Sequence, residues 1–328
     1  MSHISRRSFA ASLSGLAGAL AAPSLVRAQA WPSRAITLVV PFPAGASTDI
    51  VARLLAEKLR VDLGQGVVVE NKVGAGGNLA ALGVARAAPD GYTLFVSSSG
   101  PLVTNKLLYK ALSFDPLADF EPIALLGDVQ LVVATHPSVP AASLTDLIAY
   151  GKANPGKLTF GIPGFGLMGH IAGELIQRTA GFQMTTVPYR GSAPLTNDLI
   201  AGNVNVAIDF LPTYLPHIES KAVRGLAVTG EIRATQAPAV PTLSEAGLPG
   251  IAATSWFGLA GPKGLPKPIV DRLAQLSTTF MTSAEAKTKF EPIGVRTIGQ
   301  GPEALRAAQL GEITKWEGVI RAANISLE

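Results

Sequence analysis

Two strand–turn–helix segments of the sequence have the residues to hold an anion. The first runs from Ile36 to Leu59 and reads ITLVVPFPAGASTDIVARLLAEKL. The second repeats the order of apolar run, Pro/Gly turn and helix around Pro163–Gly169, PGFGLMG. The first N–H groups of a helix lack partners within it and carry the positive end of its dipole, so such a turn can hold a carboxylate. We therefore expect the two turns to face each other and hold a small acid between two lobes.

Three ionisable residues close to these turns are candidates for contact with that acid. Asp49 stands at the start of the first helix, where an acid stabilises the terminus and its own loop or selects a donor group of the ligand. His170 has the matching place in the second segment, and a neutral imidazole can donate one hydrogen bond. Arg190 could bind a carboxylate or pair with an acid across the hinge. Structural and binding interpretations both stay open for these residues.

Polar residues also end two of the expected strands. Asp209 closes an apolar run, and an acid there is costly unless it is paired or at a wet site, so we consider it a binding residue. Ser97, Ser98 and Ser99 close the equivalent run in the first half of the chain and offer hydroxyl donors. Because ligands of open α/β sheets bind at the C-terminal ends of strands, these residues should reach one cleft.

One glycine motif matches a dinucleotide-binding loop but lacks its partner. Gly164–Gly169, GFGLMG, fits G-x-G-x-x-G after an expected strand. A dinucleotide site also needs an acid about 20 residues further on. No acid occurs from Met184 through Arg190. The motif therefore indicates a turn close to some other ligand, or tight packing of a helix on a sheet.

The sequence carries no positive sign of catalysis or of a metal site. It has no P-loop, H-E-x-x-H or G-x-S-x-G pattern. His136, His170 and His217 are far apart and lack the spacing of metal ligands. The chain has no cysteine, which excludes disulfides, thiol nucleophiles and thiolate metal sites. We therefore expect a binding protein with no catalytic residues, no metal and no cofactor.

Residues 1–30 are predicted to be an export signal peptide. Arg6 and Arg7 precede a mild apolar run, Phe9–Leu25, and Ala28-Gln29-Ala30 supplies a small-x-small cleavage pattern. The run is too short and its side chains too small for a convincing membrane span. The paired arginines resemble a twin-arginine signal, and an ordinary secretory signal is the alternative.

The charge balance excludes several classes of partner. Three of the 27 basic residues and none of the 23 acidic residues lie in this leader, which leaves 24 basic against 23 acidic. Because basic and acidic residues are nearly equal in number, the charge argues against nucleic acid or an anionic membrane as partner. Residues 31–328 are long enough for one or two hydrophobic cores, and no later stretch is apolar enough to cross a membrane.

Strand-like and helix-like segments alternate along the chain, which is typical of an α/β protein with mainly parallel sheets. We expect strands at 36–40, 67–70, 92–97, 125–134, 158–162, 185–187, 204–210, 225–228 and 254–258. We expect helices at 50–60, 79–87, 144–153, 170–179, 198–202, 268–281 and 302–323. Three elements near residue 160 repeat the order seen near residue 40, which favours two similar lobes. Lobe 1 is predicted to comprise 31–127 and 252–328, lobe 2 to comprise 128–251, and the two crossings between them to form a hinge.

Six segments together resemble the Bug-type substrate-binding proteins of bacterial tripartite tricarboxylate transporters. They are VPFPAGASTDIVAR (Val40–Arg53), VENKVGAGGN (Val69–Asn78), PDGYTL (Pro89–Leu94), VPYRGSAPLTNDLIAG (Val187–Gly202), PTLSEAGLPG (Pro241–Gly250) and WFGLAGPKGLP (Trp256–Pro266). The resemblance covers essentially the whole chain after the leader, in order. It implies a two-lobed periplasmic-binding fold of type II-like architecture that closes over a small carboxylate.

The resemblance also implies how the ligand is held. The turn Phe42–Thr48 and its counterpart in lobe 2 bind the carboxylate through backbone groups and bridging waters, and water bridges can be nearly as favourable as direct contacts. With the candidates above, the expected ligand-binding residues are Phe42, Pro43, Ala44, Gly45, Ala46, Ser47, Thr48, Asp49, Ser97, Ser98, Gly164, Phe165, Gly166, His170, Tyr189, Arg190, Gly191 and Asp209. The second turn has no serine and carries Phe165 and Met168, so we expect an apolar or aromatic acid in preference to citrate.

The expected function is therefore an exported, monomeric receptor in the periplasm that delivers a small carboxylate to transmembrane permease subunits. Two alternatives stay open at this stage. One is a ligand sensor for a two-component signalling system. The other is a periplasmic enzyme on the same fold, which would need a nucleophile and a base in the cleft.

Overall fold

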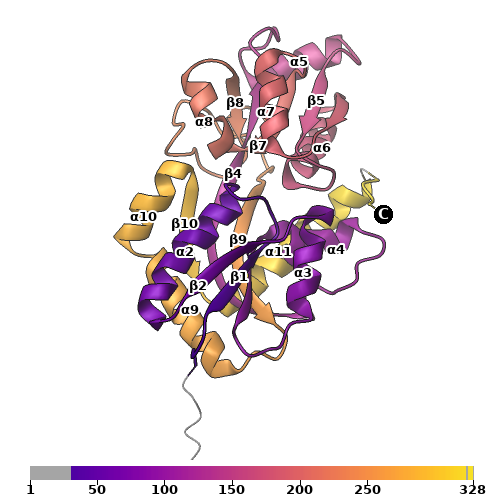
Figure 1. Cartoon of the computed structure of the whole chain (residues 1–328). Coiled ribbons are helices and arrows are strands. Elements are labelled where there is room, and N and C mark those ends of the chain that lie inside the picture. Colours follow the sequence, from indigo (N-terminus) through magenta and orange to yellow (C-terminus); the bar gives the residue numbers. More distant parts are fainter. Residues whose placement is uncertain (1–30, 323, 328) are drawn as a thin grey trace, which may run out of the picture. The chain divides into compact units, whose positions relative to one another are not determined.

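Two β-sheets that share one long strand organise the structure (Figure 1). The computed structural model describes residues 31–322 and 324–327, so the predicted signal peptide lies outside the described residues. The shared strand is β4 (Phe120–Thr135). It pairs with β9 (Thr254–Pro262) as far as Gln130, and with β7 (Val206–Phe210) from Leu131 onward.

The first sheet is built from the two ends of the described chain. Its strand order is β2, β1, β3, β9, β4 and β10, with β1 parallel to β2 and β3 and the other neighbours antiparallel. The remaining strands are β1 (Ile36–Val40), β2 (Val67–Asn71), β3 (Thr93–Ser98) and β10 (Val295–Gln300). The helices are α2 (Ser47–Leu63), α3 (Asn78–Ala85), α4 (Asn105–Leu108), α9 (Lys267–Met281), α10 (Ala284–Phe290) and α11 (Pro302–Ala322). Most of β1 is buried because the chain covers both faces, which explains its unbroken apolar run.

The second sheet comes from the middle of the chain. Its order is β6, β5, β7, β4, with β8 also paired to β4; β5 is parallel to β6 and β7, and both partners of β4 are antiparallel to it. The strands are β5 (Thr159–Ile162), β6 (Thr185–Pro188) and β8 (Arg224–Val228). The helices are α5 (Leu144–Ala153), α6 (Met168–Ala180), α7 (Ser192–Ala201) and α8 (Leu211–Glu219). Single turns of other helix types occur at Ala75–Gly77, Gly100–Thr104 and Glu291–Ile293.

The two crossings between the sheets are hydrogen-bonded to each other through Thr229, which is fully buried. Its N–H donates to the carbonyl of Leu131 at 3.0 Å, on the first crossing, and its carbonyl accepts from the N–H of Ala253 at 2.8 Å, on the second. Its hydroxyl accepts from the Leu131 N–H at 3.0 Å and donates to the Ala253 carbonyl. One buried side chain therefore ties the two crossings together.

The predicted α/β fold with two lobes and a two-crossing hinge is confirmed. The sheets are mixed, because parallel pairs occur only in β2-β1-β3 and β6-β5-β7. The reason lies in the connectivity. Strand β4 leaves the first sheet for the second and β9 enters the first sheet on the return, so the strands beside the hinge run in opposite directions.

The C-terminal helix α11 contributes to the cores of both sheets. Leu305 packs into the cluster that contains Phe95 and Phe120 of the first sheet. Trp316 and Ile320 pack into the cluster of the second sheet. Besides the two chain crossings, the packing of α11 against both cores therefore also holds the lobes together.

Several elements differ from the sequence prediction. Helix α7 begins at Ser192, where a loop was expected up to Asn197. Helix α8, with Pro212 in its first turn and Pro216 inside, was not predicted, because proline argues against a helix interior. Strand β10 was missed as well, since it has no clear alternation of apolar and polar residues and depends on its pairing with β4. By contrast, α5 forms as predicted at 144–153, and Ser143 caps it in a capping box with Asp146.

Candidate functional site

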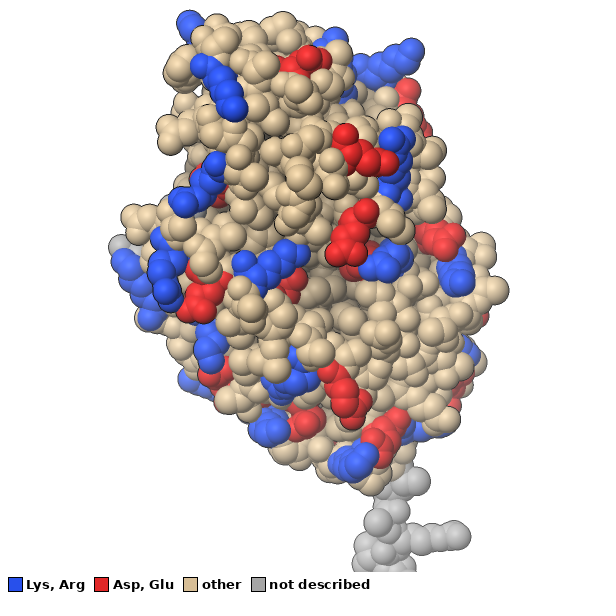
Figure 2. All heavy atoms as spheres, turned by 180° about the vertical axis from the view of Figure 1, so that it is seen from behind, with Lys and Arg blue, Asp and Glu red and all other residues tan. Residues whose placement is uncertain are grey.

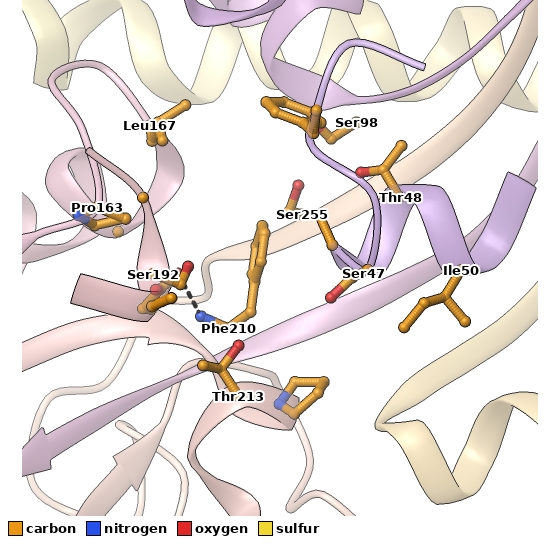
Figure 3. A pocket seen from close by; sticks show the side chains of 18 of the residues that line it. Ser47, Thr48, Ile50, Ser98, Pro163, Leu167, Ser192, Phe210, Thr213 and Ser255 are labelled. Carbon is orange, nitrogen blue, oxygen red and sulfur yellow. Dashed lines mark hydrogen bonds between the residues drawn. The ribbon is translucent and has the colours of Figure 1, made fainter. Parts of the chain in front are cut away.

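A cavity of about 970 Å³ lies where the two strand–turn–helix segments face each other. Figure 3 shows Ser47, Thr48 and Ser98 on one side of it and Pro163, Leu167 and Ser192 on the other. The lining residues are Phe42–Thr48, Ile50, Ser98–Gly100, Thr104, Pro163, Leu167–Gly169, Arg190–Pro194, Asp209, Phe210, Pro212, Thr213, Leu215, Pro216, Glu219, Gln236, Ser255, Pro292 and Ile293. This volume is in the range of small-molecule binding sites.

The first turn presents unpaired backbone donors to this cavity. Ala46 is the N-cap of α2 and has no side-chain acceptor. The Ala46 N–H donates to the carbonyl of Pro43 at 3.2 Å, and the Ile50 N–H donates to the carbonyl of Ala46 at 3.0 Å. The N–H groups of Ser47 and Thr48 find no acceptor within the described residues. A helix start with free N–H groups at a cavity wall can bind a carboxylate.

Asp49 holds this turn in shape. Its side chain accepts hydrogen bonds from the Gly45 N–H at 2.8 Å, from Arg53 Nε at 2.9 Å and from Asn71 Nδ2 at 2.9 Å. The Asn71 amide also donates to the carbonyl of Phe42 at 2.9 Å, which fixes the other end of the turn. Burial acts to raise the pKa of Asp49, but these donors outweigh it and hold the pKa below its usual value. Asp49 is buried and does not line the cavity.

The second turn is held by His170 in the same manner. Its Nδ1 accepts from the Gly166 N–H at 3.1 Å, four residues earlier, as Asp49 does from Gly45. Burial lowers the pKa of His170 to about 4, so the ring is neutral near pH 7. Phe165 is 52% exposed and lies edge-on to this ring, with the ring centroids 5.5 Å apart. Neither side chain lines the cavity.

Gly169, the last glycine of GFGLMG, allows α6 to pack closely on the second sheet. A Cβ atom on Gly169 would lie 2.1 Å from the backbone oxygen of Ile208 on β7. Gly173, one turn further along α6, would meet the Phe160 ring at the same distance. Gly169 therefore serves tight helix–sheet packing, which was one interpretation of this motif, and because Gly169 also lines the cavity, the other interpretation, a turn close to a ligand, stays a prediction.

The start of α7 forms another part of the wall. Gly191 is its N-cap, with a φ of 109° that favours glycine, and its N–H donates to the carbonyl of Pro163 at 2.9 Å. Tyr189 does not line the cavity. Its side chain is directed to Asp198, to which its hydroxyl donates at 2.8 Å. Burial, followed by this contact, raises the pKa of Tyr189 to about 12. Arg190 lines the cavity with an exposed side chain.

Asp209 is the buried acid of the cavity wall, with 2% of its surface exposed. Its Oδ1 accepts from the Phe210 N–H at 2.8 Å, whereas Oδ2 has no hydrogen-bond partner within the described residues. Burial raises the pKa of Asp209 to about 6, although the Ser192 hydroxyl and the Phe210 N–H oppose the shift.

The structure thus brings together the first turn, Ser98, Arg190, Gly191 and Asp209 from the predicted binding residues. The predicted residues that do not line the cavity are Asp49, Ser97, Gly164, Phe165, Gly166, His170 and Tyr189. The Ser97 side chain points to the other face of β3 from Ser98, as strand geometry requires. Glycines 164 and 166 shape the second turn without reaching the cavity.

Sequence reasoning named Ser99 but missed four other small polar residues of the lining, Thr104, Ser192, Thr213 and Ser255. Ser99 and Ser255 lie with their Oγ atoms 3.3 Å apart, although 156 positions separate them in sequence. Thr213 was missed because α8 was not predicted. Ser192 lies in Val187–Gly202, one of the six segments that resemble the Bug-type proteins, and this was the available indication.

Among the described residues, those that line the cavity with a charged side chain are Arg190, Asp209 and Glu219, and none of the described lining residues is a histidine or a lysine. No cluster of three metal-ligating side chains occurs in the part of the chain that the structure describes. On the face seen in Figure 2, basic and acidic side chains are interspersed, in agreement with the nearly balanced charge of residues 31–328. None of the described helices is long and apolar enough to span a bilayer.

The chain is similar to known proteins along most of its length. Residues 51–325 match the family model described as "Tripartite tricarboxylate transporter family receptor". Protein BugT of Bordetella pertussis is 38% identical over 310 residues, which cover 94% of each chain. The structure of R. palustris Rpa4515 with adipate is 38% identical, with a TM-score of 0.85 over 90% of this chain and 99% of that one. MatC from Rhodopseudomonas palustris with bound malate is 33% identical, with a TM-score of 0.80 over 88% of this chain and 100% of that one.

The resemblance to Bug-type proteins is therefore confirmed by sequence and by fold, and the chain belongs to the tripartite tricarboxylate transporter receptor family.

Proposed function

We propose that this protein is an exported solute-binding receptor that captures a small carboxylate between its two lobes in the periplasm. The observation that carries the proposal is the start of α2, where the Ser47 and Thr48 N–H groups are unpaired at the wall of the cavity. Two family members with similar folds were solved with the carboxylates adipate and malate.

The first turn is proposed to anchor the carboxylate. The backbone donors of Ser47 and Thr48, the dipole of α2 and the hydroxyl groups at the cavity wall all favour an anion there. Asp49 acts behind the turn, because a carboxylate already saturated by Gly45, Arg53 and Asn71 has little left to offer a ligand. The anchoring residues are thus proposed to be those of Phe42–Thr48 together with Ser98.

The remaining cavity is proposed to hold the carbon skeleton of the ligand. The turn before α6 contributes Pro163 and Leu167, and the first residue of α6 is Met168; all three offer apolar surface and no side-chain hydroxyl. Such a wall gains free energy from burying methylene or ring carbons. We propose that an apolar or aromatic acid fits this side of the cavity better than citrate does.

We propose that binding of the ligand shifts the two lobes toward a closed form. The hinge consists of the two crossings joined at Thr229, and α11 is packed against both cores. A ligand shifts the equilibrium toward the closed form only as far as it binds that form better than the open one. The closed form would then be recognised by transmembrane permease subunits of a tripartite tricarboxylate transporter.

A thermal-shift screen of the protein without residues 1–30 tests the proposal. Mono-, di- and tricarboxylates, aromatic acids and amino acids are added at millimolar concentration. A ligand selective for the native state raises the melting temperature, by an amount set by its concentration relative to Kd. No shift with any carboxylate would refute the proposed function, and chemical turnover of a bound acid would show an enzyme instead.

A further inference from the structure

Phe210 places an aromatic ring at the wall of the cavity. It is the last residue of β7. The residues before it on this strand are buried, whereas Phe210 is partly exposed and lines the cavity. Figure 3 shows its ring between the side chains of Ser192, at the start of α7, and Ser47, at the start of α2. The ring is therefore within reach of a ligand held between the two lobes.

The direction of the Phe210 side chain agrees with strand geometry. Alternate residues of a strand point to opposite faces of the sheet, so Phe210 shares a face with Ile208 and Asp209 does not. Ile208 belongs to the core cluster that contains residues of α6, and Phe210 packs against the same cluster. Gly169 brings the start of α6 against the carbonyl of Ile208. Phe210 lies two residues beyond this contact, at the end of the strand that reaches the cavity.

The neighbours of this ring on the cavity wall are apolar. Pro163 and Leu167 belong to the turn before α6, and Met168 is the first residue of that helix. The opposite wall is polar, because Ser47 and Thr48 line it at the start of α2. A ligand whose carboxylate binds at the start of α2 therefore has its carbon atoms on the side of the apolar wall, where the Phe210 ring stands.

The Phe210 ring has no aromatic or cationic partner among the described residues. An aromatic ring has an electron-rich face and an electron-poor edge, so two rings in an offset-stacked or edge-to-face contact gain more than burial alone provides. A ligand with a ring would make this contact at Phe210, and a ligand with a saturated ring would not. The ring pairs within the described residues are Phe95–Phe120, Phe114–Phe120, Phe165–His170 and Phe280–Phe290.

We propose that Phe210 makes the cavity select carboxylates that carry an aromatic ring over carboxylates that carry a saturated ring of the same size. This inference deepens the proposed function and rests on it, because it assumes that the carboxylate binds at the α2 turn. It assigns Phe210 as a specificity-determining residue and narrows the ligand class to aromatic acids.

Calorimetric titration near neutral pH with matched pairs of acids tests the inference. The pairs are benzoate with cyclohexanecarboxylate, phenylacetate with cyclohexylacetate, and phenylpropanoate with cyclohexylpropanoate, the ring at the end of the chain in each. The two members of a pair have the same charge and length, and burial alone favours the saturated ring, which is the more apolar. At the chain length that binds best, we expect the aromatic member to bind about threefold to tenfold more tightly, the range of a contact between two aromatic rings.

The variant Phe210→Leu adds a second readout. Leucine keeps an apolar side chain at the wall and removes the ring. The aromatic member of each pair should therefore lose more affinity than the saturated member, and the ratio of their affinities should fall to one or below. Phe182→Leu is the matched control, because Phe182 belongs to the same core cluster and does not line the cavity. It should leave the ratio unchanged, even though the smaller side chain lowers the stability of the protein.

The possible failures separate the two proposals. A ratio of one or below in the wild-type protein overturns the inference, whether or not Phe210→Leu folds. A preference for the aromatic member that persists in Phe210→Leu overturns it as well, because another residue would then cause the preference. Binding of these acids, or of another carboxylate when no ring-bearing acid binds, leaves the proposed function intact. Absence of binding by every carboxylate would overturn the proposed function and this inference with it.

Discussion

The substitution Asp49→Ala separates a residue that shapes the first turn from one that touches the ligand. It deletes the acceptor of three hydrogen bonds, from the Gly45 N–H, the Arg53 guanidinium and the Asn71 amide. Hydrogen bonds to a charged group contribute about 1.5–3 kcal/mol each. The Arg53 contact counts for less, because its side chain is 52% exposed and such pairs contribute about 1 kcal/mol or less.

We therefore expect Asp49→Ala to lower the free energy of unfolding by about 3 kcal/mol, which is about a hundredfold in the folding equilibrium. Urea unfolding followed by circular dichroism measures this loss, and Arg53→Ala, as the matched control, should lose about 1 kcal/mol or less. The affinity should also fall, and by about the same factor for each carboxylate tested. The substitution disturbs the Phe42–Thr48 turn, which is proposed to bind the carboxylate of every ligand, and leaves the opposite side of the cavity unchanged.

The contribution of Asp49 to stability should also depend on pH in a known direction. The folded pKa of Asp49 lies below its usual value, so its contribution is present above the unfolded pKa and is lost as pH falls through the folded pKa. The difference in stability between wild type and Asp49→Ala should be constant near neutral pH and shrink below about pH 4. An Asp49→Ala protein with wild-type stability and affinity at pH 7 would refute the reasoning. Loss of affinity for one class of ligand alone would show that Asp49 contacts the ligand.

Three further predictions follow from single contacts. Gly169→Ala places a Cβ 2.1 Å from a backbone oxygen that cannot move aside, so it should destabilise the protein by about 1–3 kcal/mol in urea unfolding, whereas Gly83→Ala, with open space around its Cβ, should be neutral or stabilising. His170 is neutral because burial lowers its pKa to about 4, so the unfolded state binds its proton first and stability should fall as pH drops from 6.5 toward 4. His170→Gln should remove this part of the pH profile, and an unchanged profile would contradict the assignment. Thr229→Val removes the hydroxyl shared by the two crossings and should cost about 1–3 kcal/mol, against little change for the exposed Thr288→Val.

The sequence was sufficient for much of the fold because local patterns set most of its elements. The apolar run of β1, the capping box at Ser143 and the Pro/Gly turns each act within a few residues, and the structure has elements at these places. Elements that depend on distant partners were missed. Helix α8 tolerates two prolines because its buried residues pack on the second sheet, and β10 forms against β4, about 170 residues earlier in the chain.

The candidate site, like the fold, was predicted only where it depends on residues close together in the sequence. Local reasoning found the anion-binding turn at Phe42–Thr48, because a helix start and its free N–H groups are properties of one short segment. It did not find Ser255 or Thr213, whose places at the cavity follow from the return of the chain through β9 and from α8. It also could not tell which of the two sides of β3 faces the cavity, so Ser97 and Ser98 were both named.

By itself, the sequence determined the α/β architecture and the presence of two similar turns, since these follow from periodicity, turn residues and helix ends, and the resemblance of six segments indicated the family. Only the tertiary structure decided what the acids do. Asp49 and Asp209 both looked like candidates for ligand contact, yet Asp49 lies behind the first turn, saturated by donors from that turn and from Asn71, whereas Asp209 belongs to the cavity wall, where its neighbours are the Phe210 N–H and the Ser192 hydroxyl. The difference arises because the segments that pack against a buried carboxylate determine which donors surround it. Those segments are distant in the sequence, so a local sequence pattern cannot predict them.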